Sequence, residues 1–245
     1  MWLFTKRKNK INWNIEMKIM LLWATIRVDF MKETYNYWIQ KAKNPENIDI
    51  KIAVNTEEQK NQLLEFKNVL VTNQKHIGTV YPIYLLTKNL ELENNDIIIV
   101  ASDDFYPPEN WDEHLINKLN GKSGCYFVND GYQSVGDLTI KASITMPVMT
   151  FDCLCKLNKI LYSLDYHHYY ADTELYNNLV DLNLLIDDRI NDSLVFEHKN
   201  CVSGKRVTDE YDLSYHDHVY FDRDTFNRRQ IMDVDDRIKK TRGVW

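Results

Sequence analysis

Apolar segments alternate with amphipathic ones through the first half of the chain. Continuous apolar runs, typical of strands buried on both faces, predict strands at 18–24, 48–54, 68–72 and 97–101. Apolar residues at helical spacing predict helices at 31–42, 57–66 and 80–90. Pro82 falls near the start of the third helix, where proline is tolerated. This β-α-β-α order predicts an α/β fold with a parallel sheet covered by helices.

The second half of the chain is less regular. Its patterns predict helices at 111–119, 151–161 and 172–182, and strands at 124–129, 140–148 and 194–197. A charged segment at 219–240 predicts a helical tail. Because no internal repeat or low-complexity linker interrupts the chain, we expect one domain over 18–218, an N-terminal extension over 1–17, and a tail over 219–245 that packs on the domain or extends from it.

Composition narrows the class of protein. The formal net charge of -6 argues against a general nucleic-acid coat, although it permits a local basic patch. The four cysteines lack the paired spacing of a zinc ribbon, and no secretion signal accompanies them, so we expect reduced thiols in a cytoplasmic protein. No apolar run has the length of a membrane span, but the mixed apolar and basic residues at 1–10 favour a weak peripheral membrane contact as a second possibility.

The most informative chemistry follows the buried strand at 97–101, which leads into Ser102, Asp103 and Asp104. Adjacent carboxylates at a strand end repel each other and lose hydration, and a hard divalent cation shared with a phosphate offsets both costs. The alternative is that Ser102 and Asp103 only cap the turn. Ligands of open α/β sheets bind beyond the carboxyl ends of the strands, so a binding site is expected at this edge.

Four motifs, spread over about 18–229, stand in an order that resembles family-2-like glycosyltransferases of the GT-A fold. They are Ala24-Thr25-Ile26-Arg27, Ser102-Asp103-Asp104, Tyr170-Ala171-Asp172-Thr173-Glu174-Leu175 and Val195-Phe196-Glu197-His198-Lys199-Asn200. The resemblance implies a mixed, mainly parallel central sheet flanked by helices, and an enzyme that moves a sugar from a nucleotide-sugar donor. The chain departs from the family pattern at Ser102 and Ala171, which stand where the family has acids.

The resemblance also implies roles on the donor side. Thr25, Arg27 and Asn55 would hold the nucleoside, and Asp103 would face the ribose or the water shell of a metal. The metal, Mn²⁺ or Mg²⁺, would be bound by Asp104 and His198, a ligand pair of carboxylate and imidazole. In the polar loop that follows, Lys205 and Arg206 would offset charge on the leaving diphosphate. UDP is the expected nucleotide.

On the acceptor side, the resemblance makes Asp172 the catalytic base, with Glu174 as the fallback. A base is needed because the acceptor hydroxyl must lose its proton as it attacks the sugar. Asp172 could instead cap a helix, and Glu174 could simply be an acid in a first turn. The aromatic segment before the base makes His167 and His168 candidate acceptor contacts. Trp111 is a third candidate, although it could also begin a helix capped by Asn110.

We therefore expect an inverting, metal-dependent glycosyltransferase that uses a hydroxyl of a glycan or protein as the acceptor. A hydroxymethylated base of DNA is the alternative acceptor, which tail cations such as Arg228 and Arg229 would help to bind. A nucleotidyltransferase of the same fold is less favoured, because the turn after the first strand lacks glycine. An inactive nucleotide-sugar-binding module is the remaining alternative, and the sequence leaves the oligomeric state open.

Overall fold

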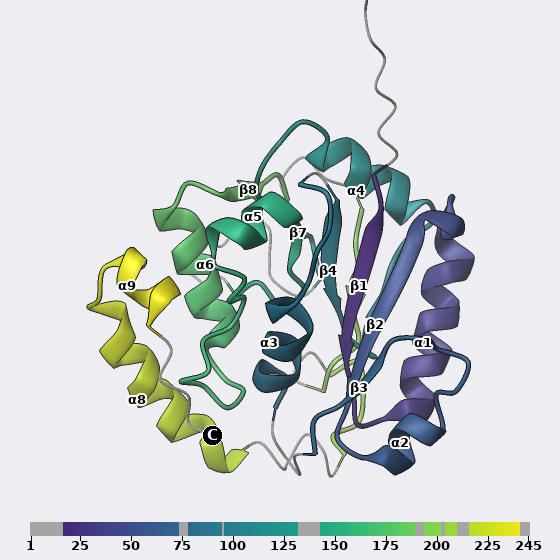
Figure 1. Ribbon diagram of the computed structural model, residues 1–245, viewed down its shortest axis with the longest axis horizontal. Coiled ribbons are helices and arrows are strands. Elements are labelled where there is room, and N and C mark those ends of the chain that lie inside the picture. Colours follow the sequence, from purple (N-terminus) through teal and green to yellow (C-terminus); the bar gives the residue numbers. More distant parts are fainter. Residues whose placement is uncertain are drawn as a thin grey trace, which may run out of the picture.

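The computed structural model describes residues 17–73, 78–94, 96–131, 143–189, 194–201, 204–209 and 216–240. Within these residues a central sheet has the strand order β3-β2-β1-β4-β7-β6-β8 (Figure 1). Its strands are β1 (Ile19–Ala24), β2 (Ile48–Val54), β3 (Val69–Val71), β4 (Ile97–Ala101), β6 (Cys125–Phe127), β7 (Val148–Thr150) and β8 (Leu185–Asp187). The short strands β5 (Phe105–Tyr106) and β9 (Glu197–His198) form a separate antiparallel pair.

The sheet is mixed and mainly parallel. β1 pairs in parallel with both β2 and β4, and β2 pairs in parallel with β3. β7 is antiparallel to its neighbours β4 and β6, whereas β8 is parallel to β6. Parallel neighbours need helical crossovers, which explains the alternation of strands and helices in the first half of the chain. The predicted fold class is confirmed.

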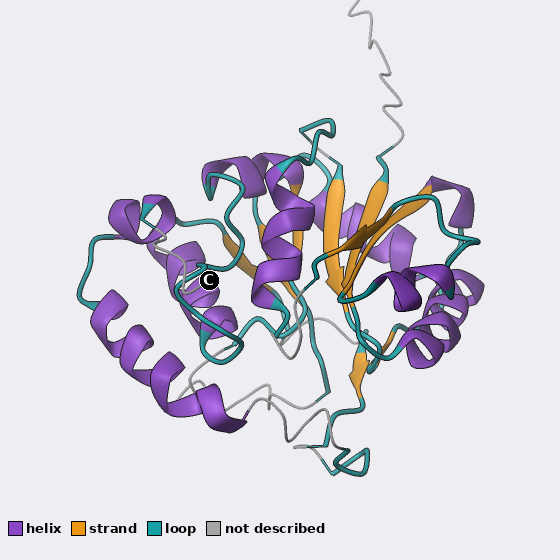
Figure 2. Cartoon of the chain, turned by 60° about the horizontal axis from the view of Figure 1, so that its bottom comes forward, coloured by secondary structure: helices purple, strands orange, loops and turns teal. Residues whose placement is uncertain are grey.

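Helices flank the sheet on both faces (Figure 2). They are α1 (Val28–Lys41), α2 (Glu57–Asn61), α3 (Val80–Lys88), α4 (Trp111–Leu119), α5 (Phe151–Lys156), α6 (Ala171–Asp181), α8 (Val219–Gln230) and α9 (Val234–Lys239), with short 3-10 turns η1 (Pro45–Asn47) and η2 (His216–His218). α1 and α4 contribute to the hydrophobic core on one face, and α3, α5 and α6 to the core on the other. The tail helices α8 and α9 lie beside α6 (Figure 1).

The buried strand β4 divides its side chains between the two cores. Ile97 and Ile99 belong to the core under α1 and α4, whereas Ile98 and Val100 belong to the opposite core. This alternation is the period of two that a strand imposes, and both faces are apolar because helices cover both. The continuous apolar run at 97–101 is therefore explained by burial on two sides.

Trp111 is a core residue, which corrects its assignment as an acceptor contact. Its ring packs edge-to-face on Trp38 at a centroid distance of 4.9 Å, and Trp38 packs in the same way on Trp23 at 6.1 Å. The indole N–H of Trp111 donates to the carbonyl of Trp38 over 2.9 Å. With 0% of its surface exposed, Trp111 cannot contact an acceptor. Asn110 is the residue before α4, as expected, but its side chain makes no capping hydrogen bond.

Several predicted elements in the second half are wrong in extent. Residues 140–142 lie outside the described residues, and 143–147 are not a strand, because β7 begins only at Val148. The helix predicted at 151–161 ends at Lys156, since Asn158 and Lys159 take left-handed backbone conformations that an α-helix cannot continue. The tail is two helices, α8 and α9, and not one.

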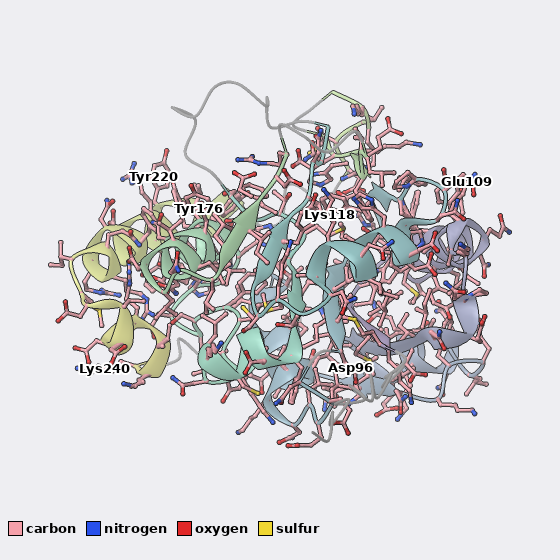
Figure 3. The ribbon with its side chains drawn as sticks, turned by 90° about the horizontal axis from the view of Figure 1, so that it is seen from above. Asp96, Glu109, Lys118, Tyr176, Tyr220 and Lys240 are labelled. Atoms are coloured by element: carbon pink, nitrogen blue, oxygen red, sulfur yellow. The ribbon has the colours of Figure 1, made fainter. Side chains whose placement is uncertain are left out.

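The tail packs on the rest of the chain. Phe226 of α8 and Ile238 of α9 are buried in the same core as α3, α5 and α6. Tyr220 and Lys240 lie at one end of the molecule, and Glu109 lies at the opposite end (Figure 3). In the part of the chain that the structure describes, no helix combines the length and apolarity needed to cross a membrane. The expected membrane contact of 1–10 lies outside the described residues.

Candidate functional site

A cavity of about 600 Å³ opens at the carboxyl ends of β1, β2 and β4. This volume is within the usual range for small-molecule sites. The cavity gathers segments that are far apart in the sequence, including the turns after the three strands, the strand β9 and the start of α6. Its lining includes most of the predicted site residues: Thr25, Arg27, Asn55, Asp103, Asp104, His168, Asp172, His198 and Arg206.

The turns after β1 and β2 are tied together by one glutamine. Gln59 completes a capping box at the start of α2 with Thr56. Its side-chain carbonyl accepts from the backbone N–H of Asn55 over 2.8 Å, and its amide donates to the carbonyl of Ile26 over 3.0 Å. This brings Thr25 and Asn55 to one end of the cavity. The Thr-x-x-Gln spacing is visible in the sequence, so this anchor could have been found from the capping-box signature.

Arg27 and Asp103 form a bidentate ion pair in the cavity wall. The Nε and one terminal nitrogen of Arg27 donate to the two carboxylate oxygens of Asp103 over 2.9 and 2.8 Å. The other terminal nitrogen donates to Asp209 over 3.0 Å. Burial raises the pKa of Asp103 against the opposing effect of Arg27. Burial acts to lower the pKa of Arg27, but Asp103 and Asp209 outweigh it and hold that pKa far above neutral. Both Asp103 oxygens are thus held by the guanidinium of Arg27.

Asp104 and His198 face each other within the cavity. The pairing of β5 with β9 sets Phe105 opposite His198 and stacks the two rings at 4.0 Å. An Asp104 carboxylate oxygen then lies 3.2 Å from His198 Nε2. Ser102 donates to the other oxygen over 2.6 Å. Burial acts to raise the pKa of Asp104, but the hydrogen bonds with His198 and Ser102 prevail and hold it below its ordinary value.

This pair fits a hard divalent cation. A carboxylate oxygen and an imidazole nitrogen are ligands that suit Mn²⁺ and allow Mg²⁺. Within the described residues there is no cluster of three or more His, Cys, Asp or Glu side chains that could hold a metal. The described part of the chain therefore offers two ligands, and diphosphate oxygens and water would have to complete the coordination.

Asp172 and Glu174 lie two residues apart in α6, but their side chains have different surroundings. Asp172 lines the cavity, and its carboxylate accepts from the backbone N–H of Thr173 over 2.8 Å. The cap of α6 is Tyr170, with a left-handed φ of 64°, so the interpretation of Asp172 as the N-cap is wrong. Glu174 is buried and accepts from Tyr166 Oη over 2.7 Å and from Arg229. Glu174 does not line the cavity, which removes it as the fallback base.

In two other pairs of neighbouring predicted residues, only one residue lines the cavity. His168 lines the cavity, whereas His167 stacks on His218 at a centroid distance of 4.2 Å and does not line it. Arg206 lines the cavity and donates to Asp209 over 2.9 Å. Lys205 lies outside the lining and pairs with Glu197 over 3.6 Å, so it is not placed to contact a ligand there.

Gly78 also lines the cavity, although no sequence motif predicts it there. A Cβ at this position would lie 2.6 Å from the carbonyl oxygen of His167, a contact that the backbone cannot accommodate. Glycine is therefore required where the segment before α3 meets the loop before α6. Glycine is uncommon in this chain, with seven in 245 residues, and that scarcity is the signal that could have drawn attention to it.

No protein-family model matches this sequence, and no curated protein matches it. Solved structures are similar in fold. A mannosyltransferase from Pyrobaculum calidifontis, in complex with GDP-Man and Mn²⁺, has a TM-score of 0.58 and 12% identity, over 86% of this chain and 64% of that one. Residues 1–349 of S. aureus TarS in complex with UDP have a TM-score of 0.56 and 13% identity, over 89% of this chain and 73% of that one.

The complex of the same TarS fragment with UDP-GlcNAc has a TM-score of 0.54 and 13% identity, over 75% of this chain and 59% of that one. At such identities the likeness is one of fold. The chain therefore has the GT-A-like fold of these glycosyltransferases, as the motif order predicts.

Proposed function

We propose that this protein is an inverting, metal-dependent glycosyltransferase that uses a UDP-sugar donor and a hydroxyl acceptor on a glycan or protein. The proposal rests on one observation: Arg27, Asp104, Asp172 and His198, from four separate motifs, line a single cavity. The GT-A-like fold supports it, as do the ligands of similar proteins, which are UDP and UDP-GlcNAc for TarS and GDP-Man with Mn²⁺ for the mannosyltransferase.

The donor would bind along the strand ends. Thr25 and Asn55, where β1 and β2 end, offer polar groups to the nucleoside. Arg27 binds both oxygens of Asp103 and shares Asp209 with Arg206, so its main contribution is to hold Asp103 in the cavity wall. Arg206 lines the cavity and is the cation best placed to face the diphosphate.

Asp104 and His198 would hold the divalent cation, because they are the two facing ligands in the cavity. When bound there, the cation supplies the Lewis acidity that eases departure of the nucleoside diphosphate. Ser102 keeps the Asp104 carboxylate oriented through its hydrogen bond. The substitution of serine for an acid in the family pattern thus preserves a polar partner for the metal ligand.

Asp172 would act on the acceptor. Its carboxylate takes the proton of the acceptor hydroxyl while that oxygen forms a bond to the anomeric carbon. The bond from the anomeric carbon to the diphosphate oxygen breaks on the opposite face, which inverts the configuration. Hydrogen bonding to Thr173 orients the Asp172 carboxylate at the start of α6. His168 and Tyr169 form the cavity wall beside it.

We favour a glycan or protein hydroxyl over a DNA base as the acceptor. Two of the tail cations that would contact phosphates are buried, since Arg229 and Arg237 are 1% and 4% exposed. Others, Lys239 and Lys240, pair with Asp235 and Asp236 on the same helix. Among the described tail cations Arg228 stays exposed, but the burial and pairing of these four reduce the positive charge that the tail presents to a nucleic-acid backbone.

A panel of nucleotide sugars tested with Mn²⁺ separates the proposed enzyme from its alternatives. A true donor should raise the melting temperature by mass action and release free UDP slowly, and chelation should abolish both effects. A rise in melting temperature without UDP release, with or without a hydroxyl acceptor, would indicate an inactive binding module. If no nucleotide sugar changes the melting temperature, the proposed function is wrong.

A further inference from the structure

Asp222, in the tail helix α8, is a fully buried carboxylate with an unusual set of partners. One of its oxygens accepts from the backbone N–H of His167 over 2.9 Å, and the other accepts from those of His168 and Tyr169 over 2.9 and 2.8 Å. The ring Nδ1 of His167 lies 3.2 Å from the first oxygen. A buried charge is stable only when it is well hydrogen-bonded, and three consecutive N–H groups meet that need here.

The segment bound by Asp222 is the loop that leads into α6. Residues 163–170 form neither helix nor strand, so their backbone donors need partners from elsewhere. Asp222 supplies these partners on one side, and Gly78 lies in close contact with His167 and His168. The loop is therefore held between two segments that are distant in sequence. His168, Tyr169 and Tyr170 of this loop line the cavity.

The same face of α8 also holds the start of α6. Asp222, Thr225, Phe226 and Arg229 are buried at helical spacing. Phe226 stacks on Tyr170 at 5.3 Å. Arg229 donates to Glu174, in the first turn of α6, and to Asp165, at the start of the loop. One helix face thus binds the loop through Asp222 and the helix that carries Asp172 through Arg229.

We propose that Asp222 is a positioning residue of the active site, which fixes the cavity wall at 168–170 and with it the place of Asp172. The inference rests on the proposed function. Asp222 touches no substrate; it acts through the backbone of the loop. The tail thereby completes the site. Its removal or loosening lowers the rate of the chemical step more than it weakens donor binding, because Thr25 and Asn55 directly follow the paired strands β1 and β2, and Arg27 is held by Asp103.

The test is Asp222→Asn, with Asp224→Asn as the matched control, since Asp224 is on the same helix with 74% of its side chain exposed. Asparagine keeps one oxygen, so some of the three backbone donors must face an NH₂ group. We expect kcat to fall by roughly 10- to 100-fold, as a displacement of about 1 Å can produce, with KM for the donor changed by less than about threefold. Amide hydrogen exchange at 167–169 should accelerate by roughly tenfold or more, while exchange in β4 stays slow. The control should change neither readout.

Unchanged exchange at 167–169 in Asp222→Asn would overturn the anchoring. Faster exchange with a parental kcat would show that Asp222 is only structural and would overturn its positioning role. Should the variant fail to fold, exchange in the parent decides: the amides at 167–169 should open together with α8, and independent fast exchange overturns the inference. The exchange readout does not depend on the reaction, so a parent protein that transfers no sugar contradicts the proposed function alone.

Discussion

Two arginine clusters in this protein use the same chemistry in different surroundings. Arg27 joins Asp103 and Asp209, and borders the cavity with 18% of its side chain exposed. Arg229 joins Glu174 and Asp165 with 2% of its side chain exposed. It also donates to the carbonyls of Arg237 and Lys240, at the end of the tail. Each guanidinium therefore connects segments that are far apart in the sequence.

Solvent access, and not residue type, separates the ion pair at the cavity from the ion pair enclosed in the protein. In the Arg229 cluster every N–H of the guanidinium has a partner within the protein, and none faces the cavity. Such a cluster holds elements together, because removing one partner leaves the other charge buried, with neither water nor an opposite charge beside it. In the Arg27 cluster the same charges lie beside Asp104 and His198, where a charged ligand would bind.

The sharpest test of the comparison is at α6, where Asp172 lines the cavity and Glu174 belongs to the buried Arg229 cluster. Asp172→Asn keeps the shape of the side chain but cannot accept a proton, so sugar transfer should fall by roughly two to four orders of magnitude. Its melting temperature and donor affinity should stay at parental values. Glu174→Gln should instead lower the melting temperature, because Arg229 loses one of its two charged partners.

Steady-state transfer assays and thermal unfolding of both variants decide the assignment. If Asp172→Asn transfers sugar near the parental rate while Glu174→Gln is inactive at an unchanged melting temperature, the base is the other carboxylate. If both variants remain fully active, the inverting mechanism is wrong.

Removing Arg229 from its buried cluster should lower the free energy of unfolding. Arg229→Ala leaves Glu174 and Asp165 buried without their partner, and breaking a buried pair in this way typically costs about 3–5 kcal/mol. Arg228→Ala is the matched control. Arg228 is exposed and its guanidinium donates to Thr225, so its loss should change stability by less than about 0.5 kcal/mol. Denaturant unfolding measures both, and a loss below about 1 kcal/mol for Arg229→Ala would contradict the structural role.

At the cavity, beside the Arg27 cluster, Asp104→Ala should remove metal-dependent nucleotide binding while the fold is kept. Loss of a second-shell partner typically lowers metal affinity 10- to 100-fold, so loss of a direct ligand should cost roughly tenfold or more. His198→Ala should weaken binding less, because the carboxylate carries the charge that attracts the cation. Titration of UDP with Mn²⁺ by calorimetry checks both variants. Parental affinity in Asp104→Ala would mean that the metal site is elsewhere.

The smallest effect concerns two cysteines of α5 that differ in the same way as the arginines. Cys153 is buried and Cys155 is exposed. Burial raises the pKa of Cys153 to about 12, so at pH 8 it stays a thiol, and the thiolate that would react forms only as the pH approaches that value. At pH 8 an alkylating reagent should modify Cys155 in the native protein and Cys153 only after unfolding. Both cysteines lie on the tryptic peptide 142–156, so fragmentation of that peptide by tandem mass spectrometry locates the label, and native modification of Cys153 would contradict its burial.

The parallel half of the fold could be predicted well because its signals are local. β2 and β4 have the predicted bounds, as does α4 in the second half, since a strand covered on both faces leaves an uninterrupted apolar run and a helix leaves a regular spacing. The helix predicted at 57–66 is too long, because α2 ends at Asn61. The strand ends then indicated the edge of the sheet where a ligand site is expected, and Thr25, Asn55, Asp103 and Asp104 all lie at the cavity. Their convergence follows from the parallel sheet itself, which brings the carboxyl ends of β1, β2 and β4 to one edge.

The tail could not be predicted in the same way. The buried face of α8 is made of Asp222, Thr225, Phe226 and Arg229, so it has no apolar stripe for a periodicity argument to detect. Its polar groups are buried only because acids and backbone donors near α6 satisfy them. A sequence pattern reports which side chains avoid water, but not which charges will find partners inside.

The order of elements and the acids at the strand ends can therefore be predicted from sequence alone, because both depend on neighbours along the chain. That Asp172 faces the cavity while Glu174 does not depends on packing between distant segments. The partner that draws Glu174 inward, Arg229, is 55 residues away in the sequence. Charges can be buried only as complete sets, and those sets are assembled by packing between distant segments.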